Sequence, residues 1–333
     1  MSTVKRLLSI VLSVCVVFLL SSCNKSNNKK FLNSNKKDIN IAFLKGPTGL
    51  GALKLIDDSK NGNTASNYNI SVLTDPNQIV AQISNGEVDI AALPTNLAAT
   101  LYNKSAMLKI VAINTLGTLY IVSDKDEDIN SVYDLKGKTI YTTGQGSTPE
   151  YVLNFILDSN NIYRQKDVDI EYRTEHTELA SLVISGKSKL AMLPEPFVTQ
   201  VINKNSDIVR SIDLTKEWEK SANNNSALAM GCLVARNDFI DENKDAIDTF
   251  LNEYSESVNY INNNVEKASE LSEKYEIMPK DIARDAIPKC NIVYIDGSEM
   301  SLMTNGFLEV LFDFDPKSIG GRLPNEDFYY KKQ

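Results

Sequence analysis

Two stretches of the chain, one hundred positions apart, repeat the same order of residue types. The first runs over 86–94 (GEVDIAALP) and the second over 186–194 (GKSKLAMLP). Each predicts the end of a helix, a glycine turn, a buried strand and a proline that starts the next helix. Any strand–helix unit shares part of this hydrophobic pattern, but the matched glycines and prolines favour a duplicated, two-lobed α/β architecture.

Further strands are predicted on both sides of this repeat. The first set of β-rich runs covers 39–44, 69–73, 88–93, 109–114 and 119–123, and the second covers 138–142, 168–172 and 189–193. Helical spacing separates them: Pro149 follows a predicted N-cap at Thr148, and Thr177 is predicted to cap a later helix. Such alternation favours mostly parallel sheets flanked by helices, and the helices predicted after Cys232 need a sheet face to cover, most naturally that of the first lobe.

Charge and residue counts exclude several classes of protein. The 333 residues carry 35 Lys and Arg against 43 Asp and Glu, so the basic footprint of a nucleic-acid binder is missing. The single histidine, His176, excludes a His-rich zinc site. Residues 46–51 match the first spacing of a P-loop without its Lys-Ser/Thr, and no Gly-x-Ser-x-Gly elbow surrounds Ser147. We therefore predict no enzyme, no catalytic residue, no cofactor and no metal site.

The N-terminus has the features of an export signal. Lys5 and Arg6 precede an apolar run over 7–20, which is too short for a comfortable membrane span. Leu-Ser-Ser-Cys at 20–23 resembles the bacterial lipobox, which implies a signal peptide at 1–22 and lipidation of Cys23. The alternatives are a plain signal peptide or an uncleaved anchor. Residues 23–38, rich in Asn, Ser and Lys, then form a flexible tether. Cys232 and Cys290 remain in the body, and a disulfide between them stays open.

Several motifs, in this order, resemble one family. They are the lipobox, the strand–loop–helix opening, 86–94, DLKGKTI at 134–140, LPEPF at 193–197, and SIGGRLP at 318–324 with FYY at 328–330. Together they resemble the type 2 periplasmic-binding-protein fold, specifically the ABC-importer receptors for sulfonates, nitrate and thiamine-pyrimidine precursors. The resemblance implies lobe I at 39–118 and 232–333, lobe II at 119–231, and a ligand cleft between the lobes.

Candidate ligand contacts follow from the topology of open α/β sheets. Ligands bind beyond the carboxyl ends of the strands, where glycines admit a close approach and helix N-termini offer unpaired N–H groups. Plain turn and capping chemistry is the alternative for each residue alone. The set predicted as ligand-binding is Gly46, Pro47, Thr48, Gly49, Pro94, Thr95, Asn96, Thr115, Gly117, Gly144, Gly146, Ser147, Thr148, Glu195 and Pro196.

Three residues carry separate expectations. Glu195 stands between two prolines at the end of a buried strand and either accepts hydrogen bonds from a ligand or is structural. Trp218 lies in a charged stretch and is expected to pack on a helix. His176 is expected to be a polar loop residue near the cleft mouth.

The sequence thus predicts a lipid-anchored, extracytoplasmic and monomeric solute receptor of an ABC importer. Its expected partners are a small-molecule ligand, the ABC permease with its ATPase, and the membrane through the lipid anchor, but not nucleic acid. The alternatives are a sensor or surface protein on the same fold and, less favoured, an enzyme similar to pyrimidine synthases. The identity and charge of the ligand stay open.

Overall fold

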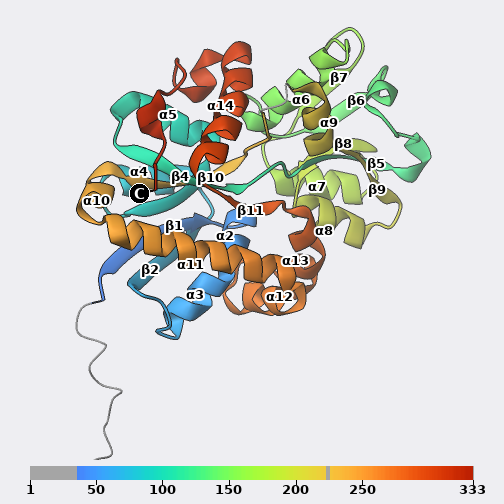
Figure 1. Cartoon of the computed structure of the whole chain (residues 1–333). Coiled ribbons are helices and arrows are strands. Elements are labelled where there is room, and N and C mark those ends of the chain that lie inside the picture. Colours follow the sequence, from blue (N-terminus) through green and yellow to red (C-terminus); the bar gives the residue numbers. More distant parts are fainter. Residues whose placement is uncertain (1–35, 223–225, 333) are drawn as a thin grey trace, which may run out of the picture. The chain divides into compact units, whose positions relative to one another are not determined.

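The computed structural model describes residues 36–222 and 226–332. The signal segment, Cys23 and nearly all of the tether lie outside these residues. The fold below is that of the unit that begins at Asp38. Its two sheets, with their helices, form two lobes (Figure 1).

The first lobe contains a six-stranded sheet in the order β11-β4-β10-β3-β1-β2. Its strands come from two separate parts of the chain: β1 (Asp38–Leu44), β2 (Asn67–Leu73), β3 (Ile90–Pro94) and β4 (Leu108–Thr115), then β10 (Gly231–Arg236) and β11 (Ile292–Ile295).

The second lobe contains a five-stranded sheet in the order β7-β6-β8-β5-β9. Its strands are continuous in the chain: β5 (Leu119–Asp124), β6 (Thr139–Thr142), β7 (Asp169–Tyr172), β8 (Leu190–Pro194) and β9 (Ile208–Asp213). The run at 119–123, grouped above with the first set of strands, therefore belongs to the second sheet.

Most strands in each sheet share one direction, as predicted. β1 to β4 run together and β6 to β9 run together, whereas β10, β11 and β5 are reversed. The reversal of β5 and β10 has a topological cause. The chain passes between the sheets at the carboxyl ends of their parallel strands, so each of these two strands begins at that edge and must run away from it.

Nine helices of the described residues belong to the first lobe. They are α2 (Pro47–Gly51), α3 (Leu53–Lys60), α4 (Pro76–Ser84), α5 (Thr95–Ser105), α10 (Asn237–Glu242), α11 (Lys244–Asn263), α12 (Val265–Lys274), α13 (Lys280–Ala286) and α14 (Gly297–Phe314). In Figure 1, α3 and α11 lie on one side of the first sheet, and α5 and α14 on the other. The apolar stripe of α11, which includes Phe250 and Tyr254, is buried in the core on its side, as predicted.

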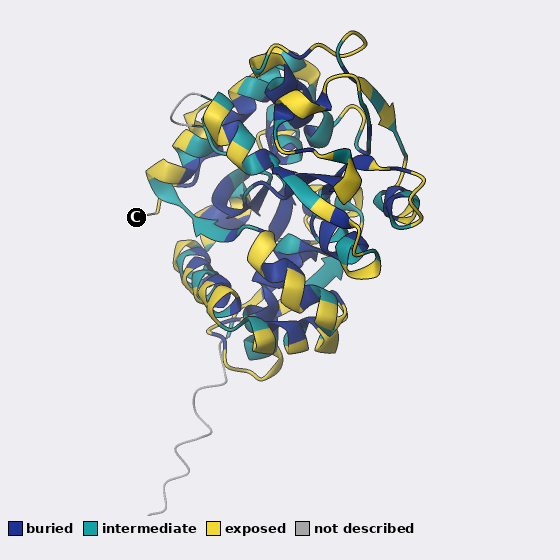
Figure 2. Cartoon of the chain, turned by 90° about the vertical axis from the view of Figure 1, so that its right-hand side faces the viewer, coloured by how far each residue is buried: buried dark blue, intermediate teal, exposed yellow. Residues whose placement is uncertain are grey.

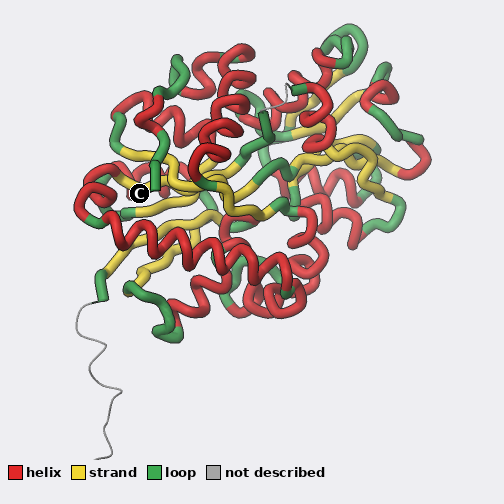
Figure 3. Tube along the Cα trace, in the orientation of Figure 1, coloured by secondary structure: helices red, strands yellow, loops and turns green. Residues whose placement is uncertain are grey.

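The helices of the second lobe are α6 (Thr148–Ser159), α7 (His176–Ile184), α8 (Phe197–Lys204) and α9 (Leu214–Ser221). Two predicted caps were wrong by one or two positions. The N-cap of α6 is Ser147 rather than Thr148, and that of α7 is Glu175 rather than Thr177. Pro149 is equally tolerated at the second helical position, because that N–H also lacks a partner within the helix. Figure 3 shows the strands of both sheets with helices around them.

The repeat detected in the sequence is a repeat of structure. β3 and β8 start and end one hundred residues apart and have the same burial pattern, four buried residues followed by a half-buried proline. The preceding helices, α4 and α7, end at Ser84 and Ile184, and the glycines that follow both have positive φ, 77° at Gly86 and 71° at Gly186. The strands at the centre of both sheets are buried (Figure 2).

One hydrophobic core continues from the first lobe into the second. Trp218 of α9 is fully buried, with its ring 4.6 Å from Phe155 of α6 and 5.7 Å from Phe307 of α14. The prediction that Trp218 packs on a helix is confirmed. Within the described residues, Cys232 and Cys290 are buried free thiols, so no disulfide joins them. Among the same residues, no helix is long and apolar enough to cross a membrane.

Candidate functional site: the carboxyl ends of the two sheets

Strand pairing brings several predicted ligand residues to one edge of the sheets. Gly231, the first residue of β10, pairs with both Pro94 and Thr115, at the carboxyl ends of β3 and β4. In the second lobe, Leu119 pairs with Pro194 at the carboxyl end of β8. Backbone hydrogen bonds extend both pairings beyond the strands, from Thr95 N to Met230 O (3.1 Å) and from Glu195 N to Thr118 O (2.8 Å).

Buried polar side chains gather at this edge. They are mostly threonines, and they lie at the ends of β3, β4, β6 and β8, at the start of α6 and on the crossover to β5: Thr95, Asn114, Thr115, Thr118, Thr142, Thr143, Thr148 and Glu195. Buried polar groups are costly unless hydrogen-bonded. Their concentration at one edge therefore marks a place where polar chemistry is needed.

Three of these residues have side-chain atoms without a hydrogen-bond partner among the described residues. They are the hydroxyl oxygens of Thr95 and Thr115 and both amide atoms of Asn114. Thr95 faces the Cys232 thiol, whose pKa burial raises to about 12, and Asn114 faces the Tyr254 hydroxyl, whose pKa burial also raises. Neither contact has the geometry of an ordinary hydrogen bond. Of the described residues at this edge, these are the side-chain atoms of the first lobe that have no hydrogen-bond partner.

The turn between β1 and α2 uses its polar groups internally. The Thr48 hydroxyl accepts from Leu44 N (3.2 Å) and donates to Leu44 O (3.0 Å). Gly46 adopts φ 109°, and a Cβ on Gly49 would lie 2.7 Å from Leu44 O, so both glycines are required by the turn itself. Pro47 begins α2 at the same place. The side chain of Thr48 is thus already satisfied.

Two other predicted residues of the first lobe also have structural partners. The Asn96 amide donates to Ser318 O (3.4 Å), which holds the C-terminal segment against α5. Gly117 lies on the crossover between the lobes, where a Cβ would come 2.1 Å from the Thr215 hydroxyl oxygen. Its carbonyl accepts from Asn291 Nδ2 (2.5 Å).

The second lobe contributes the loop before α6. Gly144 and Gly146 have φ of 76° and 72°, and the Ser147 hydroxyl donates to Gly144 O (2.6 Å). Because that hydroxyl is engaged with the loop, no side chain caps the N-terminus of α6. Pro149 has no N–H, so the helix start offers the N–H groups of Thr148 and Glu150, with the partial positive charge of a helix N-terminus. The Glu150 carboxylate in the same turn accepts from Gly146 N (2.6 Å).

Glu195 is engaged within its own lobe. Its side chain is fully buried; Oε1 accepts from Arg210 Nη2 (2.5 Å) and Nε (3.1 Å), and Oε2 accepts from Thr199 N (3.1 Å) in the first turn of α8. Pro196 is the N-cap of that helix. The Arg210 guanidinium reaches Glu195 across β5, with its centre 5.8 Å from the Tyr120 ring. Both carboxylate oxygens thus have partners, which favours the structural alternative for Glu195.

A group of three residues lies at the same edge of the second lobe, and sequence reasoning named only His176, as a loop residue near the cleft mouth, and missed Thr143 and Phe197. His176 is the first residue of α7 and half-buried, not a loop residue, and its Nδ1 lies 2.6 Å from the hydroxyl of Thr143, the residue after β6. Its ring packs against Phe197, the first residue of α8, with centroids 5.1 Å apart. The common signal is position, because each residue follows the carboxyl end of a strand. Burial lowers the pKa of His176, which favours the neutral form of its imidazole.

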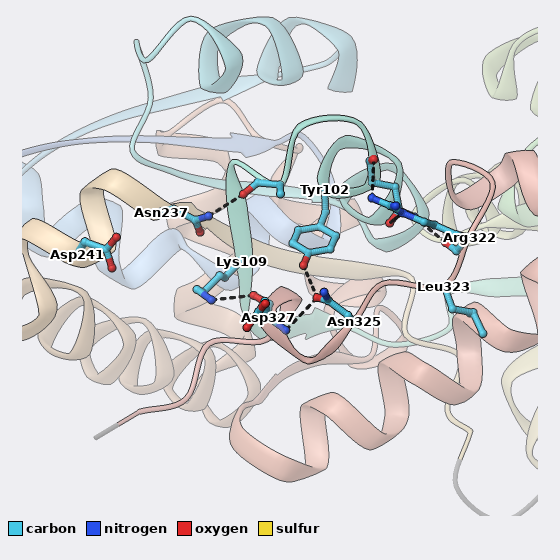
Figure 4. Close-up of a pocket in the computed structure, with 10 residues that line it drawn as sticks. Tyr102, Lys109, Asn237, Asp241, Arg322, Leu323, Asn325 and Asp327 are labelled. Atoms are coloured by element: carbon cyan, nitrogen blue, oxygen red, sulfur yellow. Dashed lines mark hydrogen bonds between the residues drawn. The ribbon is translucent and has the colours of Figure 1, made fainter.

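A separate hollow of about 550 Å³ lies at the other end of the first sheet, near the start of β4 (Figure 4). Lys109 Nζ donates there to Asp327 O (2.7 Å), and Tyr102 donates to Asn325. Arg322 Nη2 donates to Asn103 O (3.2 Å). These bonds tie the C-terminal segment to the lobe. None of the predicted ligand residues lines this hollow, so it is not the site described above.

Comparison with protein families gives one match. A sequence profile described as "ABC transporter, phosphonate, periplasmic substrate-binding protein" matches residues 63–285, more than half of the chain. A sequence search of curated proteins returns no match.

Solved structures share the fold at low sequence identity. An ABC transporter protein from Parabacteroides distasonis is 24% identical, with a TM-score of 0.76 over 90% of this chain and all of the other. The periplasmic aliphatic sulphonate binding protein SsuA from Escherichia coli is 15% identical, with a TM-score of 0.72 over 90% of this chain and 94% of that one. The periplasmic nitrate-binding protein NrtA from Synechocystis is 16% identical, with a TM-score of 0.56 over 75% of this chain and 70% of that one.

The two-lobed α/β fold predicted from the sequence is confirmed by these structures. The family's members bind small molecules outside the cytoplasm and deliver them to a permease, and they are not enzymes. On the match over residues 63–285, the chain belongs to the family of ABC-transporter, phosphonate periplasmic substrate-binding proteins.

Proposed function

We propose that this protein is the lipid-anchored solute receptor of an ABC importer and that it captures a small solute between its two lobes. The observation that carries the proposal is the edge described above. Polar side chains buried on both lobes converge where the chain crosses between the sheets, and Thr95, Asn114 and Thr115 keep atoms without partners among the described residues. Ligands of open α/β folds bind at this edge.

The proposed contacts are the side chains of Thr95, Asn114 and Thr115 in the first lobe and the N-terminal turn of α6 in the second. The solute is a sulfonate, nitrate, phosphonate or pyrimidine-type molecule. The phosphonate family profile and the sulphonate- and nitrate-binding neighbours support the first three classes. Glycines of the 144–148 loop and an uncapped helix start suit an acceptor-rich group.

A thermal-shift screen tests the receptor function. The purified body, residues 38–333, is heated with ethanesulfonate, nitrate, methylphosphonate or cytosine. A solute that binds the folded state stabilises it by RT ln(1 + [L]/Kd), which is about 2.7 kcal/mol at one hundred times Kd. At least one solute is expected to raise Tm in a concentration-dependent way. No shift with any of them at millimolar concentration contradicts the proposed ligand classes.

The lipid anchor has its own test. Cys23 is the proposed attachment point, and Cys15 lies inside the segment that the signal peptidase would remove. Metabolic labelling with palmitate is expected to be lost in Cys23→Ser and retained in Cys15→Ser, with processing sensitive to globomycin. Equal labelling of Cys23→Ser and the wild type would overturn the anchor while leaving the receptor function untouched.

A further inference from the structure

The single histidine of the chain stands on the side of the second lobe that faces the proposed site. β7, β6 and β8 are neighbours in the sheet, and their carboxyl ends lead to His176, Thr143 and Phe197 respectively. The loop with the uncapped start of α6 begins directly after Thr143. His176 therefore lies at the same sheet edge as the groups assigned to the solute.

Two contacts fix the orientation of the His176 ring. The Thr143 hydroxyl, on a residue that is 2% exposed, lies 2.6 Å from Nδ1. The Phe197 ring packs on the imidazole at an interplanar angle of 39°. When Thr143 donates to Nδ1, the proton of the neutral ring is on Nε2. The second nitrogen is then a hydrogen-bond donor whose direction is set by the protein.

We propose that His176 contacts the bound solute through Nε2 and donates a hydrogen bond to an oxyanion of the sulfonate, nitrate or phosphonate kind. This inference rests on the proposed receptor function. At the same edge of this lobe, the N–H groups of Thr148 and Glu150 in the first turn of α6 are also donors, whereas Pro149 between them has no N–H. Two carboxylates of this edge already have partners: Glu195 is paired with Arg210, and Glu150 accepts from Gly146 N. An acceptor-rich ligand is the one that these groups complement.

The charge of His176 gives the site a defined pH dependence. Burial lowers its pKa below the ordinary value of 6.5, and the negative charge of Glu175 opposes this shift. A bound oxyanion stabilises the protonated ring, so it raises that pKa, and oxyanion affinity rises as pH falls through it. A neutral ligand has no such dependence.

Nuclear magnetic resonance can follow His176 without a mutation, because the chain has one histidine. The protein, purified without a histidine tag and labelled with ¹⁵N, is titrated over pH 4.5–8.5 alone and with ethanesulfonate, nitrate or methylphosphonate. The free protein is expected to show the Nε2–H tautomer and a pKa below 6.5. At least one oxyanion is expected to shift the imidazole signals and raise the pKa. Unchanged signals with all three overturn the proposal.

Variants then separate a donor role from a structural one. His176→Gln keeps an N–H donor near the Nε2 position and is expected to retain binding of the oxyanion that shifts the signals. His176→Leu removes the donor and is expected to weaken that binding at least about tenfold. Thr177→Leu, at the exposed next position of α7, controls for a leucine in this helical turn.

The two proposals fail differently. If cytosine raises Tm while no oxyanion changes the imidazole signals, the proposed receptor function is supported and the proposed role of His176 is wrong. Equal affinity of His176→Leu and the wild type for a shifting oxyanion also contradicts the proposed contact. If neither the Tm nor the imidazole signals respond to any solute, both proposals fail.

Discussion

Threonine hydroxyls at the edge of the sheets fall into two groups that only their partners distinguish. The Thr48 hydroxyl closes the turn after β1 through two hydrogen bonds to Leu44. The Thr95 hydroxyl, at the start of α5, is fully buried and has no hydrogen-bond partner among the described residues. The same residue type thus closes a turn at one position, while at the other its hydroxyl has no partner among the described residues and is a proposed ligand contact.

This difference predicts opposite effects of the same substitution. Thr48→Val leaves Leu44 N unpaired and is expected to lower the free energy of unfolding by about 1–3 kcal/mol. Thr95→Val removes a hydroxyl that has no partner, so stability is expected to stay equal or rise, while the Tm shift given by the most effective solute is lost. Urea unfolding and the thermal-shift assay measure the two properties. A Thr95→Val variant with a full solute shift would remove Thr95 from the site.

The Glu195–Arg210 pair is expected to contribute to stability. Removing Arg210 leaves a fully buried carboxylate with only Thr199 N as its partner. Arg210→Met is therefore expected to cost about 3–5 kcal/mol of stability in urea unfolding. The double variant with Glu195→Gln is expected to recover part of that loss, because the unpaired charge is gone.

Ligand binding by Glu195→Gln then decides the role of this residue. With a structural Glu195, the single variant keeps the solute affinity of the wild type. A loss of affinity without a loss of stability means that Glu195 contacts the solute after all, against the geometry described above.

At the scale of elements, the glycine turns that precede β3 and β8 differ in their surroundings. Both Gly86 and Gly186 adopt positive φ, but a Cβ on Gly186 meets nothing within 4 Å, while a Cβ on Gly86 would lie 2.6 Å from Arg236 Nη1. Arg236 pairs with Asp89 (3.5 Å). The two turns thus share a backbone conformation but differ in the space around the glycine.

Alanine at each turn is expected to separate backbone strain from a steric contact. Gly186→Ala is expected to cost about 1 kcal/mol, the price of a left-handed conformation for a residue with a Cβ. Gly86→Ala is expected to cost more, because Arg236 must also move away from Asp89. Urea unfolding of both variants measures the difference. A larger loss for Gly186→Ala than for Gly86→Ala would contradict this reading of the turns.

Element positions were largely predictable, because short-range patterns determine them. Buried runs and Gly/Pro punctuation located β3 and β8, and helical spacing located α11. The break of the first helical segment into α2 and α3 was not predictable, since it depends on close packing: Ser257 Oγ donates to Gly51 O (2.7 Å) and accepts from Leu55 N (3.1 Å). Those partners lie some two hundred residues apart in sequence.

The location of the candidate site was predictable from the sequence, but the hydrogen-bond partners of its side chains were not. The rule on strand ends located Thr95 and Thr115, but it also selected Thr48, whose hydroxyl the turn uses. The Arg210 partner of Glu195 comes from β9, which lies on the far side of β5 from β8. No spacing in the sequence marks that pair, because it exists only once the sheet is assembled.

At the scale of the whole molecule, the two lobes touch on both sides of the crossovers. On one side the Tyr151 hydroxyl of α6 donates to Asp315 Oδ2 (3.1 Å), just after α14, and on the other Asn203 Nδ2 of α8 donates to Asp285 Oδ2 (3.0 Å) of α13. We expect ligand contacts on both lobes to draw the lobes together by hinge motion, for which we predict the crossovers near residues 118 and 231 as pivots.

The face of α6 that reaches the first lobe contains one polar group without a partner among the described residues. Tyr151 and Phe155 on this face contact Asp315 and Phe314. Asn154 lies on the same side of the helix, opposite the apolar stripe toward its own sheet; it is 3% exposed and its Oδ1 is unpartnered. The Tyr151 bond favours closure, and we expect the burial of Asn154 to oppose it, because separation of the lobes would let water reach its amide.

Substitutions on this one helix are therefore expected to move the lobes in opposite directions. Tyr151→Phe removes the bond and is expected to shift the ligand-free protein toward the open state, with a larger radius of gyration in small-angle scattering. Asn154→Leu removes the buried amide and is expected to shift the ligand-free protein toward the closed state. Each substitution is expected to change the free-energy difference between the two states by about 1 kcal/mol, or about fivefold in the open-to-closed ratio. Trp218, the sole tryptophan, lies between the lobes, and its fluorescence reports the same shifts.

Tyr330→Phe is the matched control, since its bond to Asp248 (2.8 Å) lies within the first lobe and the loss of this bond is expected to leave the radius of gyration unchanged. Equal radii for Tyr151→Phe, Asn154→Leu and this control would mean that the α6–α14 contact does not govern closure.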